Sequence, residues 1–333
     1  MKSKFVIASL LFLLSSLWIL LVPATSSASE FKVLVVMSYE EDNPWCMEIK
    51  EGIESVLGKT SDTTYFYMNT KANFNGGVGK AAEAYELYRQ LKPNGVITAD
   101  DDVQEMFVLP YLKNRTAVPV MFCGVNAEAE QYGYPAKNVS GVLERAHVAE
   151  SIAFLKQLLP SVKKIGFIVN NVPAGKALRL QVDTEKGKYL AAVASFKLVS
   201  TIAELRKTAD ILSKTTDAVY VDSLEGITDD QQRAMTNKEI FKILRESYRK
   251  PIIGANSYHV EQGALCAVVK TGQEQGETAA KQLLLAMRST KVSDIKVTQN
   301  NRGRRLINVD TMEALGITPR PIVLVGATLV KTR

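Results

Sequence analysis

KVLVVM, residues 32–37, is an almost purely aliphatic run that leads directly into a turn at Ser38-Tyr39. A short run of this kind, rich in β-branched side chains, predicts a strand that is buried on both faces. A helical pattern of apolar residues then extends from Trp45 to Leu57. Strand, loop and helix in this order form the repeating unit of a parallel sheet covered by helices.

The same alternation continues to the end of the chain. In a first series it predicts strands at 64–68, 95–98 and 118–122 and helices at 79–91 and 103–113. In a second series it predicts strands at 164–169, 197–200, 218–221, 252–253 and 264–269 and helices at 149–159, 176–193, 202–212 and 229–248. Each series is long enough for an α/β lobe of its own.

A last helix at 274–287 and a strand at 305–309 follow after the second lobe is complete by strand count. The chain is therefore expected to cross back, with connections near Gly141, Thr271 and Asn300. We predict an α/β protein of two Rossmann-like lobes with parallel sheets, joined by a three-segment hinge. Lobe 1 is expected to comprise residues 29–141 with 271–299, and lobe 2 residues 142–270 with 300–333.

The N-terminus has the pattern of a secretory signal. Lys2 and Lys4 precede an apolar stretch at 5–22, and small residues follow up to Ala28. This pattern predicts a signal peptide over residues 1–28, with an uncleaved anchor as the alternative. No cysteine stands directly after the apolar stretch to accept a lipid. We expect an exported protein that is soluble in the periplasm after signal cleavage.

Charge and cysteine content exclude other classes of protein. The formal charge is only +6, from 41 basic and 35 acidic residues, and no predicted helix carries a basic stripe, so nucleic acid is not expected as a partner. The three cysteines, Cys46, Cys123 and Cys266, are too few for a disulfide-built fold. Buried thiols are the favoured interpretation, and a bridge between Cys46 and Cys123 stays open.

Polar and aromatic residues gather in the loops that follow the predicted strands. In open parallel sheets ligands bind at this end of the strands. Aromatic walls with a few polar groups are typical of a pocket for a small polar ligand. The candidate ligand-binding residues are Ser38, Tyr39, Trp45, Asp100, Asp101, Gly124, Asn126, Asn171, Asp222, Asn256 and Tyr258.

The acidic run Asp100-Asp101-Asp102 favours a ligand with a positively charged amine, because a helix N-terminus meant for a carboxylate would not carry fixed negative charge. Helix capping is the alternative role for these residues. No further carboxylate lies at the spacing of a metal site, and no cofactor is expected.

Catalysis has little support in the sequence. The chain has two histidines, His147 and His259, about a hundred residues apart, and it lacks a Gly-x-Ser-x-Gly turn. His147 is expected to be a surface or crossover residue. An exported hydrolase that uses residues 100–102 as acids or bases is the enzymatic alternative.

Several stretches resemble one family over nearly all of residues 29–333. They include Val36-Met37-Ser38-Tyr39 with Asn43-Pro44-Trp45, the segment from Val96 to Asp101, the segment from Pro119 to Asn126, and Leu306-Ile307-Asn308-Val309. On these residues the chain resembles the substrate-binding proteins of ABC transporters, in the branch related to tryptophan and tyrosine uptake. The turn at 38–45 and the Asp-Asp loop also resemble extracytoplasmic sensing domains.

The resemblance implies a type I periplasmic binding fold and a solute-binding function without catalysis. A small polar ligand, such as an amino acid or another amine-bearing and partly aromatic molecule, would bind between the lobes. The implied partner is the membrane permease of an ABC transporter, with a membrane sensor kinase as the alternative. We expect a monomer.

Overall fold

The structure, a computed structural model, describes residues 29–222, 224, 226–233 and 235–332. The predicted signal peptide, residues 1–28, lies outside the described residues. Within them, no helix combines the length and the apolar character that a membrane span requires.

The first sheet has six parallel strands in the order β11-β5-β4-β3-β1-β2. Their bounds are β1 Phe31–Met37, β2 Ser61–Tyr67, β3 Gly95–Ala99, β4 Val120–Val125, β5 Val139–Leu143 and β11 Thr298–Gln299. Helices cover both faces: α2 (Pro44–Leu57), α3 (Gly77–Leu91), α4 (Asp101–Val103), the π-helix η2 (Gln104–Leu112) and α10 (Gly272–Met287), with short 3-10 turns η1 (Phe74–Gly76), η3 (Ala129–Tyr132) and η5 (Val292–Asp294).

Strand β1 is buried because helices pack on both of its faces. Val33, Val35 and Met37 join the core under α2 and α10, and Leu34 and Val36 join the core under α3 and η2. All five side chains are fully buried. This explains why the strand is a continuous apolar run instead of an alternating one.

The second sheet has seven strands in the order β13-β12-β10-β9-β8-β6-β7, and β12 is antiparallel to β10 while the other pairs are parallel. The strands are β6 Lys164–Asn170, β7 Ala192–Val199, β8 Ala218–Val221, β9 Ile252–Gly254, β10 Cys266–Val269, β12 Arg304–Asn308 and β13 Ala327–Val330. The helices are α5 Val148–Leu158, α6 Pro173–Glu185, η4 Lys186–Lys188, α7 Ile202–Thr215, α8 Asn237–Ser247, α9 Ser257–Glu261, α11 Val309–Ala314 and α12 Pro321–Leu324.

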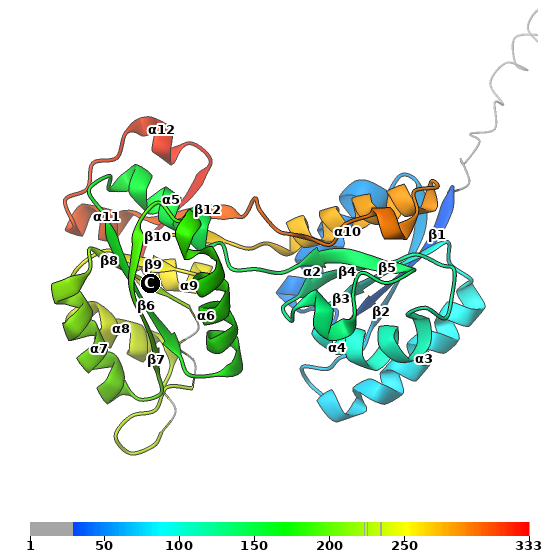
Figure 1. The fold of residues 1–333 in the computed structure, drawn as a ribbon, viewed down its shortest axis with the longest axis horizontal. Helices are drawn as coiled ribbons and strands as arrows, with labels where there is room; N and C mark the ends of the chain where they lie inside the picture. Colours follow the sequence, from blue (N-terminus) through cyan, green and yellow to red (C-terminus); the bar gives the residue numbers. More distant parts are fainter. Residues whose placement is uncertain (1–28, 223, 225, 234, 333) are drawn as a thin grey trace, which may run out of the picture.

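Each sheet with its helices forms one lobe, and the chain passes between the lobes three times (Figure 1). The first crossing, residues 144–147, joins β5 to α5; the second, 270–271, joins β10 to α10; and the third, 300–303, joins β11 to β12. The predicted α/β architecture of two parallel-dominated lobes is confirmed. Helix α10 lies against α2 although more than 200 residues separate them in sequence, so the late return of the chain completes the first lobe.

Some element predictions were wrong at their boundaries. The helix predicted at 229–248 begins only at Asn237, because Asp229 accepts the N–H groups of Gln231 and Arg233 in a turn and Thr236 caps α8 in a capping box. The helix predicted at 176–193 ends at Glu185, and strand β7 starts at Ala192.

The helix predicted at 103–113 is largely a π-helix. Pro110 lies inside it and has no N–H to donate, and the Lys113 N–H bonds to the Val108 carbonyl, five residues back, at 2.8 Å. Single π segments are frequent at functional sites. The π-helix η2 follows directly on α4, which begins within the acidic run at residues 100–102.

Cys46, Cys123 and Cys266 are all free and buried. Burial raises the pKa of the Cys46 thiol to about 12, with the nearby Asp100 adding to the shift. The thiols therefore pack as small apolar groups.

Candidate functional site

The two sheets share one strand order around their first strands. In the first lobe β1 lies between β2 and β3, and in the second β6 lies between β7 and β8. The loops after β1 and β3, and after β6 and β8, therefore diverge to opposite sides of the sheet. Ligands of open α/β sheets bind at such a switch point. Ser38 and Asp100 stand there in the first lobe, and Asn171 and Asp222 in the second.

Asp100 has an unusual backbone. It adopts φ +76° and ψ 175°, a region that is essentially reserved for glycine. Such strain costs on the order of 1–3 kcal/mol and is concentrated at functional sites. The Asp100 N–H bonds to the Cys123 carbonyl at 2.9 Å, and its carbonyl accepts from the Gln104 side chain at 3.0 Å. These bonds to β4 and η2 hold the strained conformation in place.

Asp100 is 2% exposed, and only one of its two carboxyl oxygens has a hydrogen-bond partner among the described residues. Oδ1 accepts the indole N–H of Trp45 at 3.0 Å, whereas Oδ2 has no hydrogen-bond partner among the described residues. Burial, and then the nearby Glu144 carboxylate, raise the pKa of Asp100 well above its usual range, against the opposing hydrogen bond from Trp45. A cation placed beside Oδ2 would reverse this shift.

Gly124 makes room for this arrangement. It has φ +68°, and a Cβ at this position would stand 3.0 Å from Asp100 Oδ1 and 3.4 Å from Trp45 Nε1. Its N–H donates to Gln275 Oε1 of α10 at 2.9 Å. The glycine therefore joins the surroundings of Asp100 to the helix that returns from the second lobe.

The aromatic residues Tyr39 and Trp45 are half-buried beside Asp100. The Lys71 ammonium lies 4.6 Å from the centroid of the Tyr39 ring, within the range of a cation–π contact. Burial, and then the charge of Asp100, raise the pKa of Tyr39. Its phenol stays neutral and offers a flat wall with one polar end.

Ser38 and Asp101 are committed to bonds within the first lobe. The Ser38 hydroxyl donates to the Ala99 carbonyl at 2.8 Å and accepts the Val103 N–H at 3.0 Å. The Asp101 carboxylate accepts the N–H groups of Asn126 and Ala127, at 2.9 and 3.2 Å, and the Tyr132 hydroxyl at 2.9 Å. Both side chains position the loops that carry Asp100 and Asn126.

A cavity of about 500 Å³ lies where the two lobes meet. Four of the predicted residues line it: Asn126, Asp222, Asn256 and Tyr258. The other lining residues are Lys71, Glu128, Glu144, Arg145, Ala146, Val169, Ala174, Gly175, Ala177, Leu178, Gln181 and Lys270. Four further hollows, of about 370 to 700 Å³, are each lined by one lobe alone.

The charges on the cavity wall are balanced. Its cations are Lys71, Arg145 and Lys270, and its carboxylates are Glu128, Glu144 and Asp222. Arg145 pairs with Glu128 at 2.9 Å, and Lys270 pairs with the buried Glu144. Burial tends to lower the pKa of Lys270, but Glu144 and Asp222 outweigh it and raise that pKa. The wall thus offers both signs of charge to a ligand.

The structure leaves several predicted residues off the cavity wall. Asn171 is exposed, with its N–H bonded to the Val199 carbonyl. Ser38, Tyr39, Trp45, Asp100, Asp101 and Gly124 lie behind or beside the wall in the first lobe. The 11 predicted roles in ligand binding stay predictions.

Five charged lining residues were missed in the sequence: Lys71 and Glu128 in the first lobe, and Glu144, Arg145 and Lys270. The last three belong to the first and second crossings between the lobes. The only signal for them was the predicted position of the hinge, near Gly141 and Thr271, because a hinge between two lobes also borders the space between them.

Asp222 and Asn256 come from neighbouring strand ends of the second lobe. The Asn256 side chain donates to Asp222 Oδ1 at 3.3 Å, and its backbone N–H donates to His259 Nδ1 at 3.3 Å. Among the described residues, no three His, Cys, Asp or Glu side chains are placed to hold a metal ion.

Comparison with known proteins agrees with this fold. A family model described as "ABC transporter substrate binding protein" matches residues 48–331. The tyrosine-binding protein of Clostridioides difficile is 27% identical over 186 residues, which is 54% of this chain and 50% of that protein. The chain thus aligns with about half the length of this curated relative.

Two solved structures share the fold over 91% of this chain and 100% of theirs. One is the ABC domain in complex with L-Trp from Streptococcus pneumoniae, with 21% identity and a TM-score of 0.56. The other is the ligand-free, open structure of a substrate-binding protein with adhesive properties from Clostridium difficile, with 19% identity and a TM-score of 0.70.

Proposed function

This chain belongs to the family of ABC transporter substrate binding proteins, and we propose that it captures a zwitterionic amino acid with an aromatic side chain in the cavity between its lobes. The observation that carries the proposal is the 500 Å³ cavity, which is lined by both lobes and has both signs of charge on its wall. A ligand that touches both lobes at once favours the closed arrangement over the open one.

The ligand class has two supports. The balanced charges of the wall suit a molecule with one ammonium and one carboxylate, because each charge then meets an opposite one. The names of the similar proteins point the same way, since one is a tyrosine-binding protein and another is a complex with L-Trp. Tyr258 lines the cavity, whereas Tyr39 and Trp45 lie off its wall in this structure. All three would supply flat apolar walls for the side chain of the ligand once the lobes close on it.

Asp100 is the better candidate for the ligand amine than Asp101. Its Oδ2 has no partner among the described residues, whereas both oxygens of Asp101 accept bonds from the first lobe. Because the pKa of Asp100 is raised, an ammonium would displace a proton when it binds. Asn126, Asp222 and Asn256 would supply further hydrogen bonds from the wall.

The cellular setting is part of the proposal. We place the protein in the periplasm after removal of residues 1–28, as a monomer that delivers its ligand to a membrane permease without catalysis or a cofactor. The lobe limits, predicted at 29–141 with 271–299 and 142–270 with 300–333, are likewise proposed, with one change: β5 runs to Leu143 in the first sheet, so Val142 and Leu143 belong to the first lobe. The limit between residues 299 and 300 fits the sheet membership of β11 and β12.

Titration calorimetry on protein unfolded and refolded to remove bound ligand tests this function. L-tyrosine and L-tryptophan should bind, and analogues that lack either the amine or the carboxylate should bind much more weakly. Asp100→Asn should weaken binding roughly tenfold to 150-fold, the loss of a charge-assisted hydrogen bond. Asp62→Asn, the same change at an exposed position at the start of β2, serves as the matched control.

Two outcomes would reject the proposal. One is the absence of binding heat with any aromatic amino acid. The other is equal affinity for the amino acid and for its analogue without the amine. Proton release, measured by repeating the titration in buffers of different ionisation enthalpy, should disappear in Asp100→Asn.

A further inference from the structure

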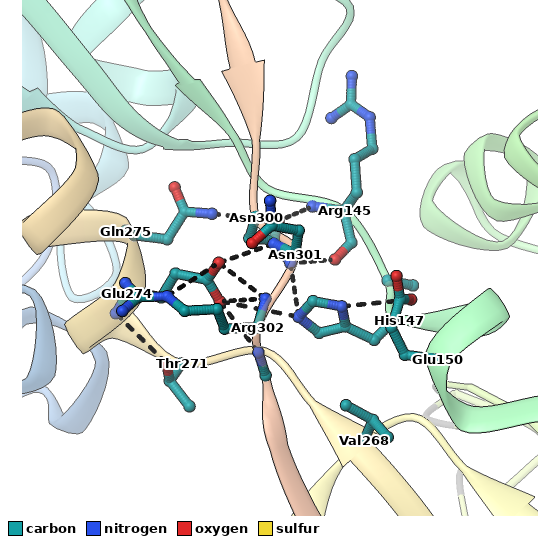
Figure 2. Close-up of polar contacts among 12 residues, drawn as sticks. Arg145, His147, Glu150, Val268, Thr271, Glu274, Gln275, Asn300, Asn301 and Arg302 are labelled. Atoms are coloured by element: carbon teal, nitrogen blue, oxygen red, sulfur yellow. Dashed lines mark hydrogen bonds and ion pairs between the residues drawn. The ribbon is translucent and has the colours of Figure 1, made fainter. Parts of the chain in front are cut away.

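The three crossings between the lobes meet in one buried polar network (Figure 2). His147 belongs to the first crossing, Glu274 to the first turn of α10 just after the second, and Asn300 to the third. Their exposed fractions are 3%, 5% and 5%. Buried polar groups lower the stability of the fold unless each has a hydrogen-bond partner, so the hydrogen bonds of this network are strongly constrained.

Glu274 ties the second crossing to the third. Its carboxylate accepts the backbone N–H groups of Asn301 at 2.7 Å, Arg302 at 2.9 Å and Gly303 at 3.1 Å. Thr271 caps the same helix by accepting the Glu274 N–H at 3.3 Å. The third crossing is thus held at the N-terminus of α10.

Asn300 ties the third crossing to the first, and its amide can point only one way. Its Oδ1 accepts the Arg145 N–H at 2.7 Å, and its Nδ2 donates to the Arg145 carbonyl at 2.9 Å. Turning the amide over would oppose donor to donor and acceptor to acceptor. The backbone of Arg145 therefore fixes Nδ2 as a donor in its remaining contact.

That remaining contact is with His147. Asn300 Nδ2 lies 2.9 Å from His147 Nε2, so Nε2 must accept the hydrogen bond and carry no proton. The ring proton then belongs on Nδ1, which faces Glu150 Oε2 at 3.4 Å. Only the neutral imidazole protonated at Nδ1 fits this network.

We propose that His147 is a proton-operated latch of the hinge: the neutral ring ties the first crossing to the third, and a proton on Nε2 breaks that tie. A protonated ring would oppose its Nε2–H to the Asn300 amide. A carboxylate oxygen that can accept that proton, Glu274 Oε2, lies 4.0 Å away. Protonation therefore transfers His147 from Asn300 to Glu274 while the two Arg145–Asn300 bonds remain, and it changes the relative position of the lobes that the hinge favours.

The charged groups around the ring support this exchange. Glu150 and Glu274 face its two nitrogens. The neighbouring cations are already paired: Arg302 with Glu277 at 2.7 Å and with Glu274 at 3.8 Å, Arg145 with Glu128, and Lys270 with Glu144. A positive imidazole would thus meet two carboxylates.

The ring is also closely packed against the third crossing. Gly303 has φ +58°, and a Cβ there would stand 2.8 Å from His147 Cδ2 and 2.6 Å from a Val268 methyl carbon. A shift of the imidazole therefore presses on the backbone at Gly303. This contact couples the protonation state of a side chain to the path of a hinge segment.

The latch is connected to the cavity through Gln275. Its Nε2 donates to Asn300 Oδ1 and to the Leu143 carbonyl, both at 3.2 Å, and its Oε1 accepts the Gly124 N–H. Gly124 lies next to the Asp100 carboxyl. A change in the contact between His147 and Asn300 can therefore be transmitted through Gln275 to the loop that contains Gly124, next to the proposed ligand site.

The other histidine cannot account for a transition near neutral pH. The chain has two histidines, and burial lowers the pKa of His259 to about 3. Asp100 is also buried and its pKa is raised, so the experiment includes an Asp100 variant as a control.

Distances between the lobes in the ligand-free protein test the latch independently of ligand binding. Dyes at Gln90→Cys on α3 and Lys207→Cys on α7, both exposed positions, report on the two lobes, and the native cysteines are buried. Between pH 8 and pH 5 the distribution of distances should shift. His147→Gln, which keeps an acceptor but cannot titrate, should lose this response, and Asp100→Asn should keep it.

A pH response that persists unchanged in His147→Gln, or no response in the unmodified protein, would overturn the proposal. Imidazole nitrogen shifts measured by NMR on the unmodified protein give a second test that does not depend on a variant folding. They should show a proton on Nδ1 alone at pH 8. A ring protonated at Nε2 at that pH would contradict the latch.

Discussion

Asp100 is where backbone strain, burial and an unpaired oxygen coincide. Each of these features lowers the stability of the folded protein, and such features are found chiefly at functional sites. The sequence predicted the acidic run as a ligand site and offered capping as the alternative. In the structure the roles of the three aspartates differ: Asp101 holds the next loop, Asp102 bonds to Thr70 Oγ1 at 2.6 Å, and Asp100 Oδ2 has no hydrogen-bond partner in the described part of the chain.

Asp100→Asn should stabilise the ligand-free protein, and the gain should grow with pH. A carboxyl whose pKa is raised by folding binds its proton more tightly in the folded state, so stability is lost as pH rises from the unfolded pKa toward the folded one. Asparagine can keep the bond from Trp45 without this loss. Urea unfolding at pH 5 and pH 8 measures the difference, and a variant less stable than the parent at pH 8 would contradict it.

Asp101→Asn should have the opposite effect on stability. An asparagine has one acceptor oxygen for the donors at Asn126, Ala127 and Tyr132, and its amide would face one of them. The expected cost is about 1–3 kcal/mol of the free energy of unfolding. Urea unfolding of Asp101→Asn beside Asp102→Asn checks this, and a loss of ligand affinity without any loss of stability would indicate direct ligand contact instead.

At the scale of elements, α2 and α10 form the closest helix pair in the first lobe. A Cβ on Gly52 would stand 2.2 Å from the Gln273 carbonyl oxygen, and a Cβ on Gly276 would stand 2.1 Å from the Ile49 carbonyl oxygen. Backbones that approach this closely need glycine at the contact. The returning helix is thereby fixed to the start of the chain.

Gly276→Ala should cost about 1–3 kcal/mol of stability, because the added methyl forces the two helices apart. Gly79→Ala in α3 is the matched control: nothing lies within 4 Å of its Cβ position, so it should stabilise by about 0.5–1 kcal/mol. Urea unfolding compares the two. Equal effects would show that α2 and α10 do not pack as described.

The order of elements could be predicted because apolar runs and periodicities are local properties of the chain. The wrong boundaries arose where a local side-chain bond ended a pattern, as Asp229 and Thr236 do before α8. The crossings near Thr271 and Asn300 could be predicted, as could a crossover position as one alternative for His147, but the contacts of the hinge network could not. Its members, His147, Glu274 and Asn300, stand more than a hundred residues apart or in separate crossings, and only the fold brings them together.

On the scale of the whole molecule, the cavity exists only because two lobes are joined by three short crossings. Capture would then depend on a rotation between lobes, with Asp100 and Tyr39 on one side and Asp222 and Tyr258 on the other. Each lobe alone offers only part of the cavity wall. Tyr258→Ala should therefore weaken ligand binding roughly thirtyfold without affecting the first lobe.

The distance between dyes at Gln90→Cys and Lys207→Cys, measured during titration with the aromatic amino acid that binds in calorimetry, tests closure most directly. The distance should shorten and saturate at the same ligand concentration as the binding heat. A distance that stays constant while calorimetry shows a saturated site would contradict a ligand held between two closing lobes.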